Sequence, residues 1–319
     1  MTNQTASPSL TSANRPRIPG FSRWRWRHLS AYLFVLPYIL VMLAFGLGPG
    51  LYALLISFAD FSAGVPDYFA AGFSNYYTVF NDFRFTFTFG NIAKYLVISV
   101  PLGIAMVVIL AILLQMRPGK LTTALRTLYF IPGAVTGPIL VLVAIFMLDP
   151  SISPFQTFLK GMGFSLLNDV IYPGSLPVIF TLMGFFSGAG LWIAIQYGAL
   201  EGLSNEVLEA ATIDGCNVWQ KILHIKLPLI RPFIIYQFIL IFAGNVQLFV
   251  EPQILGSSAN VGVGANVPAV WAPNQLAYFF AFEMGNFGSA SALSLLMLVI
   301  GLGAAYLIIR WTGFFNIEN

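Results

Sequence analysis

A few polar and aromatic side chains inside long apolar stretches have the chemistry to bind a solute. They are Trp192, Gln196, Tyr197, Gln237, Asn245, Gln247 and Glu251. Polar groups in such stretches are energetically costly and often mark a solute path. Planar amides beside aromatic rings suit a neutral polyol or glycan. We therefore expect Asn245 and Gln247 to contact a solute in transit.

The same side chains also have purely structural interpretations. Asn245 or Gln247 could bond a neighbouring helix, which contributes about 0.6–2 kcal/mol. Glu251 could lie just outside the apolar layer and touch a partner. The sequence leaves these alternatives open.

A second concentration of polar residues lies in the segment 201–228. Asn205 is expected to cap a short helix, and Glu206 and Glu209 favour its N-terminal turn. Gly215 is expected to end this helix in the left-handed conformation. The segment therefore begins with one short helix followed by a turn.

The second half of the segment is predicted to form another short helix. Asn217 and Gln220 have the spacing of a near capping box at its start. An apolar face is expected from Val218, Ile222 and Ile225, with Trp219 and Leu223 beside it. Pro228 and Pro232 then interrupt the helix. A partly apolar helical loop of this kind needs a surface to pack against.

Metal and catalytic chemistry are not expected in this chain. The two histidines, His28 and His224, and the single cysteine, Cys216, have no metal-ligand residue at useful spacing. No catalytic residue is predicted, because no nucleophile–base pair falls inside the apolar stretches. The phosphate loop G-x-x-x-x-G-K-[ST] is absent from the sequence, so we do not expect the chain to hydrolyse ATP.

The apolar stretches that carry these residues predict an all-α integral membrane protein with six transmembrane helices. The chain has 319 residues, of which 58% are hydrophobic and 8% charged, whereas a soluble domain carries about 25% charged residues. A bilayer core of ~30 Å needs about 20 apolar helical residues. The six predicted helices are Leu29–Phe58, Asn91–Leu114, Leu125–Leu148, Leu176–Gly198, Pro232–Val250 and Phe287–Ile309.

The distribution of Lys and Arg predicts the orientation of these helices. Most of the 15 basic residues fall before the first helix, between the second and third, between the fourth and fifth, or after the sixth. Cytoplasmic loops carry such an excess, so both termini and the segment 201–228 are expected in the cytoplasm. Arg84, Lys94 and Lys160 remain on the outer side, which is few for an anionic solute.

The predicted organisation has five parts. Residues 1–28 form a disordered basic cytoplasmic tail, with Trp24 and Trp26 as an interfacial anchor. Residues 29–58 form the first helix, which is too long an apolar run for a cleaved signal peptide. Residues 59–90 form an external aromatic-rich segment, residues 91–310 a five-helix core, and residues 311–319 a cytoplasmic tail.

The segment 201–228 resembles the EAA motif of permease subunits of binding-protein-dependent ABC importers. The matching residues, with Asp214 inside the motif, are Glu209, Ala210, Ala211, Gly215, Ile225, Leu227 and Pro228. The motif also lies where that family has it, between the third-last and second-last membrane helices. Glu209 alone could be a solvated charge at a helix start, but the whole motif surrounds it.

Three further stretches are similar to the carbohydrate-uptake type of these permeases, so that the resemblance covers about residues 29–310. They are Gly72–Asn91 with its aromatic residues, Gln247–Pro252, and Phe287–Ser294. One departure is residues 256–260, where that type has a glycine-rich turn.

The resemblance implies the type I ABC importer permease fold and a set of partners. A second permease subunit, commonly a different chain, would complete the pathway. Two ATPase subunits, which bind ATP and magnesium, would dock at the EAA loop, and an extracytoplasmic binding protein would deliver a sugar or oligosaccharide. The location implied is the prokaryotic cytoplasmic (inner) membrane.

Other functions remain as alternatives at this point. The solute could be another polar compound such as a glycerol phosphate. A stand-alone secondary transporter would need ion-coupling groups within the helices, and no predicted helix has an acidic residue near its centre. A membrane enzyme would need the catalytic cluster that the sequence lacks.

Overall fold

The computed structural model describes residues 32–61, 65–258 and 267–312, and these residues form helices without any β-sheet. The predicted tail 1–28, with Trp24 and Trp26, lies outside the described residues, as do residues 313–319 of the predicted tail 311–319, whose first two residues continue the last helix. The chain divides into two compact units, residues 1–52 and 53–319. The first unit contributes most of the apolar helix Tyr32–Ile56, whose middle, Met42–Leu47 (η1), is π-helical.

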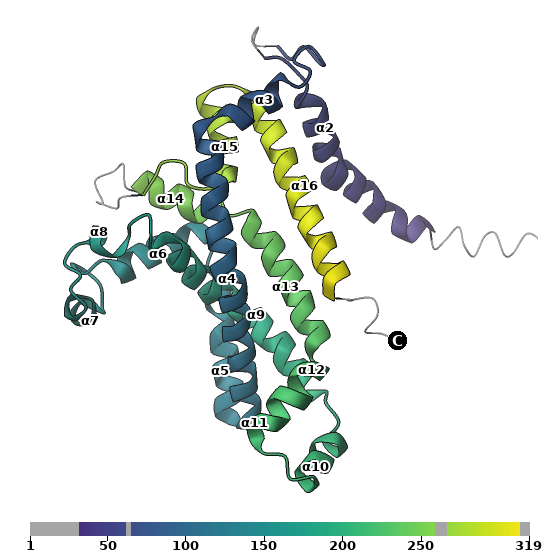
Figure 1. Ribbon diagram of the computed structural model, residues 1–319, viewed down its shortest axis with the longest axis vertical. Helices are drawn as coiled ribbons and strands as arrows, with labels where there is room; N and C mark the ends of the chain where they lie inside the picture. Colours follow the sequence, from purple (N-terminus) through teal and green to yellow (C-terminus); the bar gives the residue numbers. More distant parts are fainter. Residues whose placement is uncertain (1–31, 62–64, 259–266, 313–319) are drawn as a thin grey trace, which may run out of the picture. The chain divides into compact units, whose positions relative to one another are not determined.

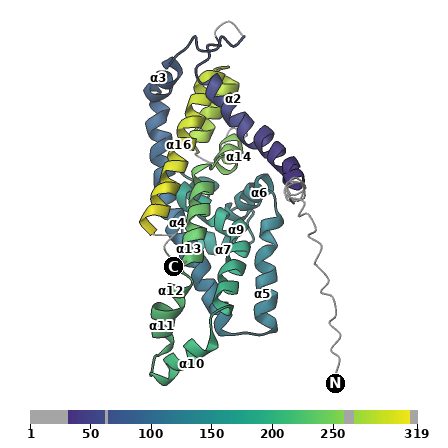
Figure 2. The same cartoon turned by 90° about the vertical axis from the view of Figure 1, so that its right-hand side faces the viewer.

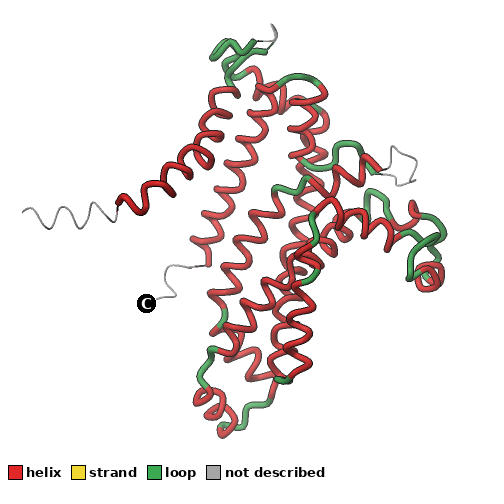
Figure 3. The backbone as a smooth tube through the Cα atoms, turned by 180° about the vertical axis from the view of Figure 1, so that it is seen from behind, coloured by secondary structure: helices red, strands yellow, loops and turns green. Residues whose placement is uncertain are grey.

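Figure 3 shows the helices of the described residues in red. In order they are α2 (Gly48–Ile56), α3 (Ser74–Asn81), α4 (Phe83–Met116), α5 (Lys120–Phe130), η2 (Pro132–Ala134), α6 (Gly137–Leu148), α7 (Gln156–Gly161), α8 (Leu167–Val170), α9 (Leu176–Glu201), α10 (Asn205–Ile213), α11 (Val218–Lys221), η3 (Ile222–Lys226), α12 (Leu227–Leu229), α13 (Arg231–Val246), α14 (Val250–Ser258), α15 (Pro273–Tyr278), η5 (Phe279–Glu283) and α16 (Phe287–Thr312).

Among the described residues, five helices are long and apolar enough to cross a membrane. They are Tyr32–Ile56, Phe83–Met116, Leu176–Glu201, Arg231–Ser257 and Phe287–Thr312. A sixth span is reached if the bent pair Lys120–Ala134 and Gly137–Leu148 counts as one. The all-helical membrane fold expected from the sequence is confirmed in this form.

The third predicted helix, Leu125–Leu148, is wrong as a continuous span. The structure has two helical pieces there, which meet at 106°. Pro132 and Pro138 lack a backbone N–H and cannot continue an α-helical ladder, and Thr136 between them is extended. The apolar composition predicted a helix, and the two prolines bend it.

The second span begins earlier than predicted, at Phe83 rather than Asn91. Asp82 is the N-cap of α4, and its carboxylate accepts a hydrogen bond of 2.8 Å from the backbone N–H of Arg84. The carboxylate also forms an ion pair with the Arg84 guanidinium at 2.7 Å. The segment predicted as an external aromatic stretch therefore contains α3 and the first turns of α4.

Within the unit of residues 53–319, α4 and α9 pack side by side, and α13 lies against both (Figure 1). The helices α10 and α11 lie at one end of this group and α3 lies at the other (Figure 2). We call the end with α10 and α11 the loop end. This arrangement joins the 201–230 segment directly to the long helices.

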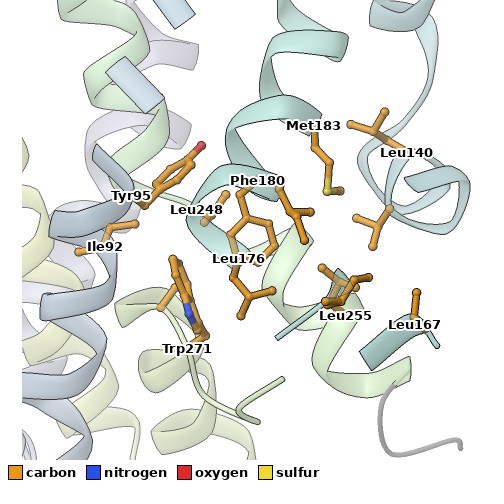
Figure 4. Close-up of a cluster of buried hydrophobic side chains, with 14 residues drawn as sticks. Ile92, Tyr95, Leu140, Leu167, Leu176, Phe180, Met183, Leu248, Leu255 and Trp271 are labelled. Carbon is orange, nitrogen blue, oxygen red and sulfur yellow. The ribbon is translucent and has the colours of Figure 1, made fainter. Parts of the chain in front are cut away.

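A buried apolar cluster packs the N-terminal halves of α4 and α9 against α6, α14 and the turn before α15. Phe180 of α9 is at its centre, with its ring 5.0 Å from that of Trp271 and 6.3 Å from that of Tyr95 (Figure 4). All three side chains are 2% exposed or less. Aromatic contacts of this geometry add about 0.5–1.5 kcal/mol beyond burial.

Asn75 ties α3 to the chain that follows the first helix. Its Nδ2 donates to the carbonyl oxygens of Ser57 and Ala59, both at 2.9 Å. The side chain is 7% exposed, and a Cβ at Gly288 of α16 would collide with it. A buried amide with both protons bonded fixes this end of the helix group.

The close contact between α9 and α5 depends on Gly190. A Cβ at this position would lie 2.7 Å from the carbonyl carbon of Tyr129 and 2.9 Å from Cα of Phe130. Both are backbone atoms, so the clash cannot be relieved by a side-chain rotation. We expect Gly190→Ala to lower the free energy of unfolding by about 1–3 kcal/mol, the usual cost of overpacking.

The measurement is thermal unfolding of the purified protein in detergent. Gly198→Ala is the matched control, because it is in the same helix and its Cβ would meet no atom within 4 Å. That control should leave the midpoint unchanged or raise it. Equal midpoints for the two variants would contradict the proposed close packing.

Candidate functional site

A cavity of about 430 Å³ lies among α4, α9, α13 and the start of α14. Its polar lining comes from Tyr95, Ser99, Thr181, Ser187, Trp192, Asn245, Gln247 and Glu251. Long apolar helices supply the rest of the wall, with glycines on α4, α9 and α13. A partly enclosed volume with a few convergent polar groups has the form of a ligand site.

The fold brings four of the predicted pathway residues to this cavity. Trp192 comes from α9, and Asn245, Gln247 and Glu251 come from the region where α13 ends and α14 begins. The amide Nδ2 of Asn245 donates to Oγ of Ser99 at 3.0 Å. Asn245 therefore bonds a neighbouring helix and lines the cavity at the same time.

The remaining predicted pathway residues do not line this cavity. Gln196 is fully buried, and its Nε2 donates to Oε1 of Gln237 at 2.9 Å across α9 and α13. The guanidinium carbon of Arg126 lies 4.1 Å from the ring centroid of Tyr197, which is a cation–π geometry. Gln196 and Tyr197 follow Trp192 along α9 and lie nearer the loop end, because α9 continues past the cavity.

The helix α4 supplies lining residues that the sequence interpretation did not select. Tyr95 and Ser99 lie one turn apart and face the cavity together. A hydroxyl and a phenol one turn apart in an otherwise apolar run are the signal that could have identified them. Only the packing of α4 against α9 showed which face of the helix is turned inward.

Of the described residues that line the cavity, Glu251 is the one with a carboxyl group, and none is Lys, Arg or His. No described Lys or Arg lies within ion-pair distance of this carboxyl group; the ion pair that the structure shows joins Arg84 and Asp82. The charge character of the cavity is therefore neutral to negative.

The loop at the other end of α9 forms two short helices, as the sequence predicts. Ser204 rather than Asn205 caps the first, since its Oγ accepts from the N–H of Glu206 at 3.2 Å. Asn205 is the first helical residue, so that expectation is off by one position. Gly215 follows with φ +83°, in the left-handed conformation expected there.

The second loop helix starts with a capping box. Oδ1 of Asn217 accepts from the N–H of Gln220 at 2.9 Å, and Oε1 of Gln220 accepts from the N–H of Asn217 at 2.8 Å. Nζ of Lys221 donates to Oγ1 of Thr212 at 2.6 Å and so joins the two helices. The loop is an ordered unit with its own hydrogen bonds.

The predicted apolar face of Val218, Ile222 and Ile225 is wrong. Ile222 is buried, Ile225 is half-buried and Val218 is 52% exposed. The segment Ile222–Lys226 is π-helical, and this shifts the side chains out of α-helical phase. The apolar side chains that the loop exposes are Val207, Ile213, Val218, Trp219 and Leu223.

The residues of the EAA-like motif occupy two environments. Glu209, Ala210, Asp214, Gly215 and Pro228 are exposed, whereas Ala211 is buried and Ile225 and Leu227 are half-buried. The first group is exposed, as are the apolar side chains named above. We call this surface, made by the exposed apolar and motif residues of 201–228, the loop surface.

The helices that can span a membrane enclose a cavity lined by polar groups, and an ordered, partly apolar loop lies at one end of them. This arrangement is typical of the membrane subunit of a transporter. Residues 107–311 match the family described as "Binding-protein-dependent transport system inner membrane component". The chain belongs to this family.

Two relatives agree with this assignment over most of the chain. The arabinooligosaccharides transport system permease protein AraP of Bacillus subtilis is 26% identical over 303 residues, which are 92% of this chain and 94% of the relative. The diacetylchitobiose uptake system permease protein NgcF of Streptomyces coelicolor is 28% identical over 295 residues, covering 86% of this chain and 79% of the relative.

The fold resembles that of a chain in the crystal structure of a bacterial alginate ABC transporter in complex with an alginate pentasaccharide-bound periplasmic protein. The TM-score is 0.71 at 19% identity, and the match covers 90% of this chain and 96% of that chain. A second structure, a bacterial ABC transporter involved in the import of the acidic polysaccharide alginate, gives a TM-score of 0.72 at 20% identity, covering 91% and 97%.

The left-handed turn at Gly215 can be tested by substitution. We expect Gly215→Val to destabilise the loop by about 1–2 kcal/mol, because a β-branched residue rarely adopts positive φ. Hydrogen exchange of the amides of residues 205–221 is the measurement, and it should become faster. Gly215→Asn should exchange almost as slowly as the unmodified protein, since asparagine tolerates this conformation. Equally slow exchange in the valine variant would show that the turn is not constrained.

Proposed function

We propose that this chain is a transmembrane subunit of an ATP-driven ABC importer and forms half of the pathway for a carbohydrate delivered by an extracytoplasmic binding protein. The observation that carries the proposal is the cavity, where Trp192, Asn245 and Gln247 meet Tyr95 and Ser99 of α4. The names of the relatives, which refer to arabinooligosaccharides and diacetylchitobiose, support the substrate class.

The lining of the cavity favours a neutral, hydroxyl-rich solute. Amide and hydroxyl groups donate and accept hydrogen bonds, and the half-buried ring of Trp192 offers a flat apolar face. Glu251 accepts hydrogen bonds from hydroxyl groups and opposes an anionic solute. A glycerol phosphate, the alternative polar solute, is less compatible because no basic side chain lines the cavity.

The loop surface is proposed to dock an ATPase subunit. Ile213 is 87% exposed and Trp219 is 72% exposed, and both lie at the loop end, which the distribution of basic residues assigns to the cytoplasm. Clustered exposed apolar side chains rimmed by polar groups mark interaction sites. ATP and magnesium would bind to two such partners, and a second permease subunit would complete the pathway in the inner membrane.

A stand-alone carrier is the competing function. It has no need for an ordered loop with exposed Ile213 and Trp219, whereas an importer subunit needs such a surface for its ATPase. The experiment that separates the two is purification of the chain from its native membrane in mild detergent, followed by mass spectrometry. An ATPase, a second permease and a binding protein are expected, and a chain that purifies alone would overturn the proposal.

The role of the cavity is tested by Asn245→Ala and Gln247→Ala. Each should slow ATP-driven uptake about tenfold in reconstituted vesicles, since each removes a polar contact worth about 1–1.5 kcal/mol. Asn81→Ala is the matched control, because its amide lies on the surface of α3 and bonds only the Tyr77 carbonyl.

The hydrogen bond to Ser99 needs its own control, because Asn245 also joins two helices. Thermal unfolding of Asn245→Ala, Ser99→Ala and the double variant isolates the coupling between these two side chains from the other contacts of Ser99. Unchanged uptake in both amide variants, with the complex assembled, would exclude these side chains from the pathway.

ATPase docking is tested by Glu209→Lys and Trp219→Ala. Each should reduce the amount of ATPase that stays bound during purification by more than tenfold, because a buried Trp at an interface commonly contributes about 2 kcal/mol or more. Trp311→Ala, which removes a 95% exposed Trp outside the loop, is the control. Full retention of the ATPase in both loop variants would assign docking to another surface.

A further inference from the structure

One side chain of the loop reaches back to the long helices. Nζ of Lys226 donates to Oε1 of Gln115 at 2.5 Å, one residue before α4 ends. Nε2 of the same Gln115 donates to the carbonyl oxygen of Leu200 at 3.3 Å, near the end of α9. Through one amide, the loop is bonded to two different spans.

Apolar side chains pack around this hydrogen-bonded link where it meets α4 and α9. Ile222 and Ile230, on either side of Lys226, are buried in one cluster with Leu200 of α9 and with Val108, Ala111 and Ile112 of α4. The first loop helix is different, since Ala211 is the one buried residue of α10. The loop therefore has a part that is packed onto the spans, residues 222–230, and a part that projects from them.

The two helices held by Gln115, α4 and α9, are two of the four that line the cavity. Tyr95, Ser99 and Gly103 line it from α4, and Thr181 and Trp192 line it from α9. From Gln115 to Gly103 along α4 is about 18 Å at the rise of an α-helix. The one proline inside α4, Pro101, lies beyond Gly103, so a displacement at the end of this uninterrupted stretch is carried to the cavity wall.

The hydrogen bonds of Lys226 and Gln115 fix the position of the loop on the helices more narrowly than apolar packing does. Apolar contacts are non-directional and allow sliding, whereas a charge-assisted hydrogen bond fixes one geometry. Burial lowers the pKa of the Lys226 ammonium below the usual lysine value, the charge of Lys221 lowers it further, and Glu201 acts in the opposite direction. The partly buried ammonium therefore depends on Gln115 for an acceptor.

We propose that Lys226, Gln115 and the Leu200 carbonyl form a positioning link that carries a displacement of the loop to α4 and α9, and so to the cavity. The inference rests on the proposed function, because an ATPase must move the loop. Lys226 and Gln115 touch neither solute nor nucleotide in this arrangement. Breaking the link leaves the ATPase bound and active but separates its cycle from the cavity.

The test measures cavity exposure instead of solute uptake, so no substrate has to be identified. Cys216, the single cysteine of the chain, is replaced by serine, and Gly103→Cys places a thiol in the cavity wall, where its Cβ meets no atom within 4 Å. N-ethylmaleimide labelling of the purified whole complex is timed with and without ATP. ATP hydrolysis and ATPase retention are measured on the same samples.

Five variants, one of them a control, are compared in this background. Lys226→Met and Gln115→Leu each should reduce the ATP-dependent change in labelling rate about tenfold, the size expected for loss of one charge-assisted hydrogen bond. The double variant should lose no more than either single variant. Gln115→Glu keeps an acceptor for Lys226 and should keep the change. Lys120→Met, which removes an exposed lysine of α5, is the control.

The outcomes separate this inference from the proposed function. If the unmodified chain carries no ATPase, the proposed function fails and the link with it. If the unmodified complex responds to ATP and the Lys226 and Gln115 variants respond like Lys120→Met, the link alone is wrong. Loss of the ATPase from Lys226→Met would also overturn it, because the lysine would then act in docking.

Discussion

Hydrocarbon offers no hydrogen-bond partners, and this constraint accounts for much of the structure. Backbone groups at membrane depth must bond one another, so the described part of the chain is built from helices. Polar side chains within the helices also form hydrogen bonds within the protein, although Oε1 of Gln196 and Nε2 of Gln237 are buried without a hydrogen-bond partner. Thr181 donates to the carbonyl of Pro177 in its own helix, Asn245 donates to Ser99 of α4, and Gln196 donates to Gln237 of α13. Each bond either satisfies a side chain locally or joins two helices.

The breaks in the helices occur where the same constraint is relaxed. The bend between η2 and α6 and the interruption between α13 and α14 lie close to each other, since a Cβ at Gly137 would meet Cγ1 of Val250 at 3.2 Å. Gln247, Val250 and Glu251 at the second interruption line the cavity. Irregular backbone at membrane depth is tolerated where it is buried in protein or borders a cavity. The helix breaks and the cavity are thus parts of one arrangement.

The segment 201–230 combines two opposite surfaces in a short stretch. Ile222 and Ile230 are buried against α4 and α9, while Ile213 and Trp219 are exposed. The π-helical turn at Ile222–Lys226 makes this possible, because it rotates successive side chains out of a single α-helical face. Lys226 lies at the end of that turn and points to Gln115 rather than to solvent. The loop is in this way held by the long helices and presents a surface to a partner.

The sequence by itself determined the features that depend on composition and local chemistry. The scarcity of charges predicted a membrane protein, the apolar runs predicted its long helices, and Gly215 and Asn217 predicted the turn and the cap of the loop. The family followed from the motif around Glu209. These signals are local, because a helix length, a left-handed glycine or a cap is set by residues a few positions apart.

Only the tertiary structure decided which polar residues meet. Gln196 and Asn245 are both amides in apolar helices, yet one is buried against Gln237 and the other lines the cavity. Tyr95 and Ser99 complete that cavity from a helix more than 140 residues earlier in the chain, and Gln115 meets Lys226 over a separation of 111 residues. The sequence patterns also predicted neither the bend at Pro132 nor the π-helical segment Ile222–Lys226. Helix rotation and helix pairing are set by packing between distant segments, and a nearly uniform apolar surface carries no periodic signal of which face is turned inward.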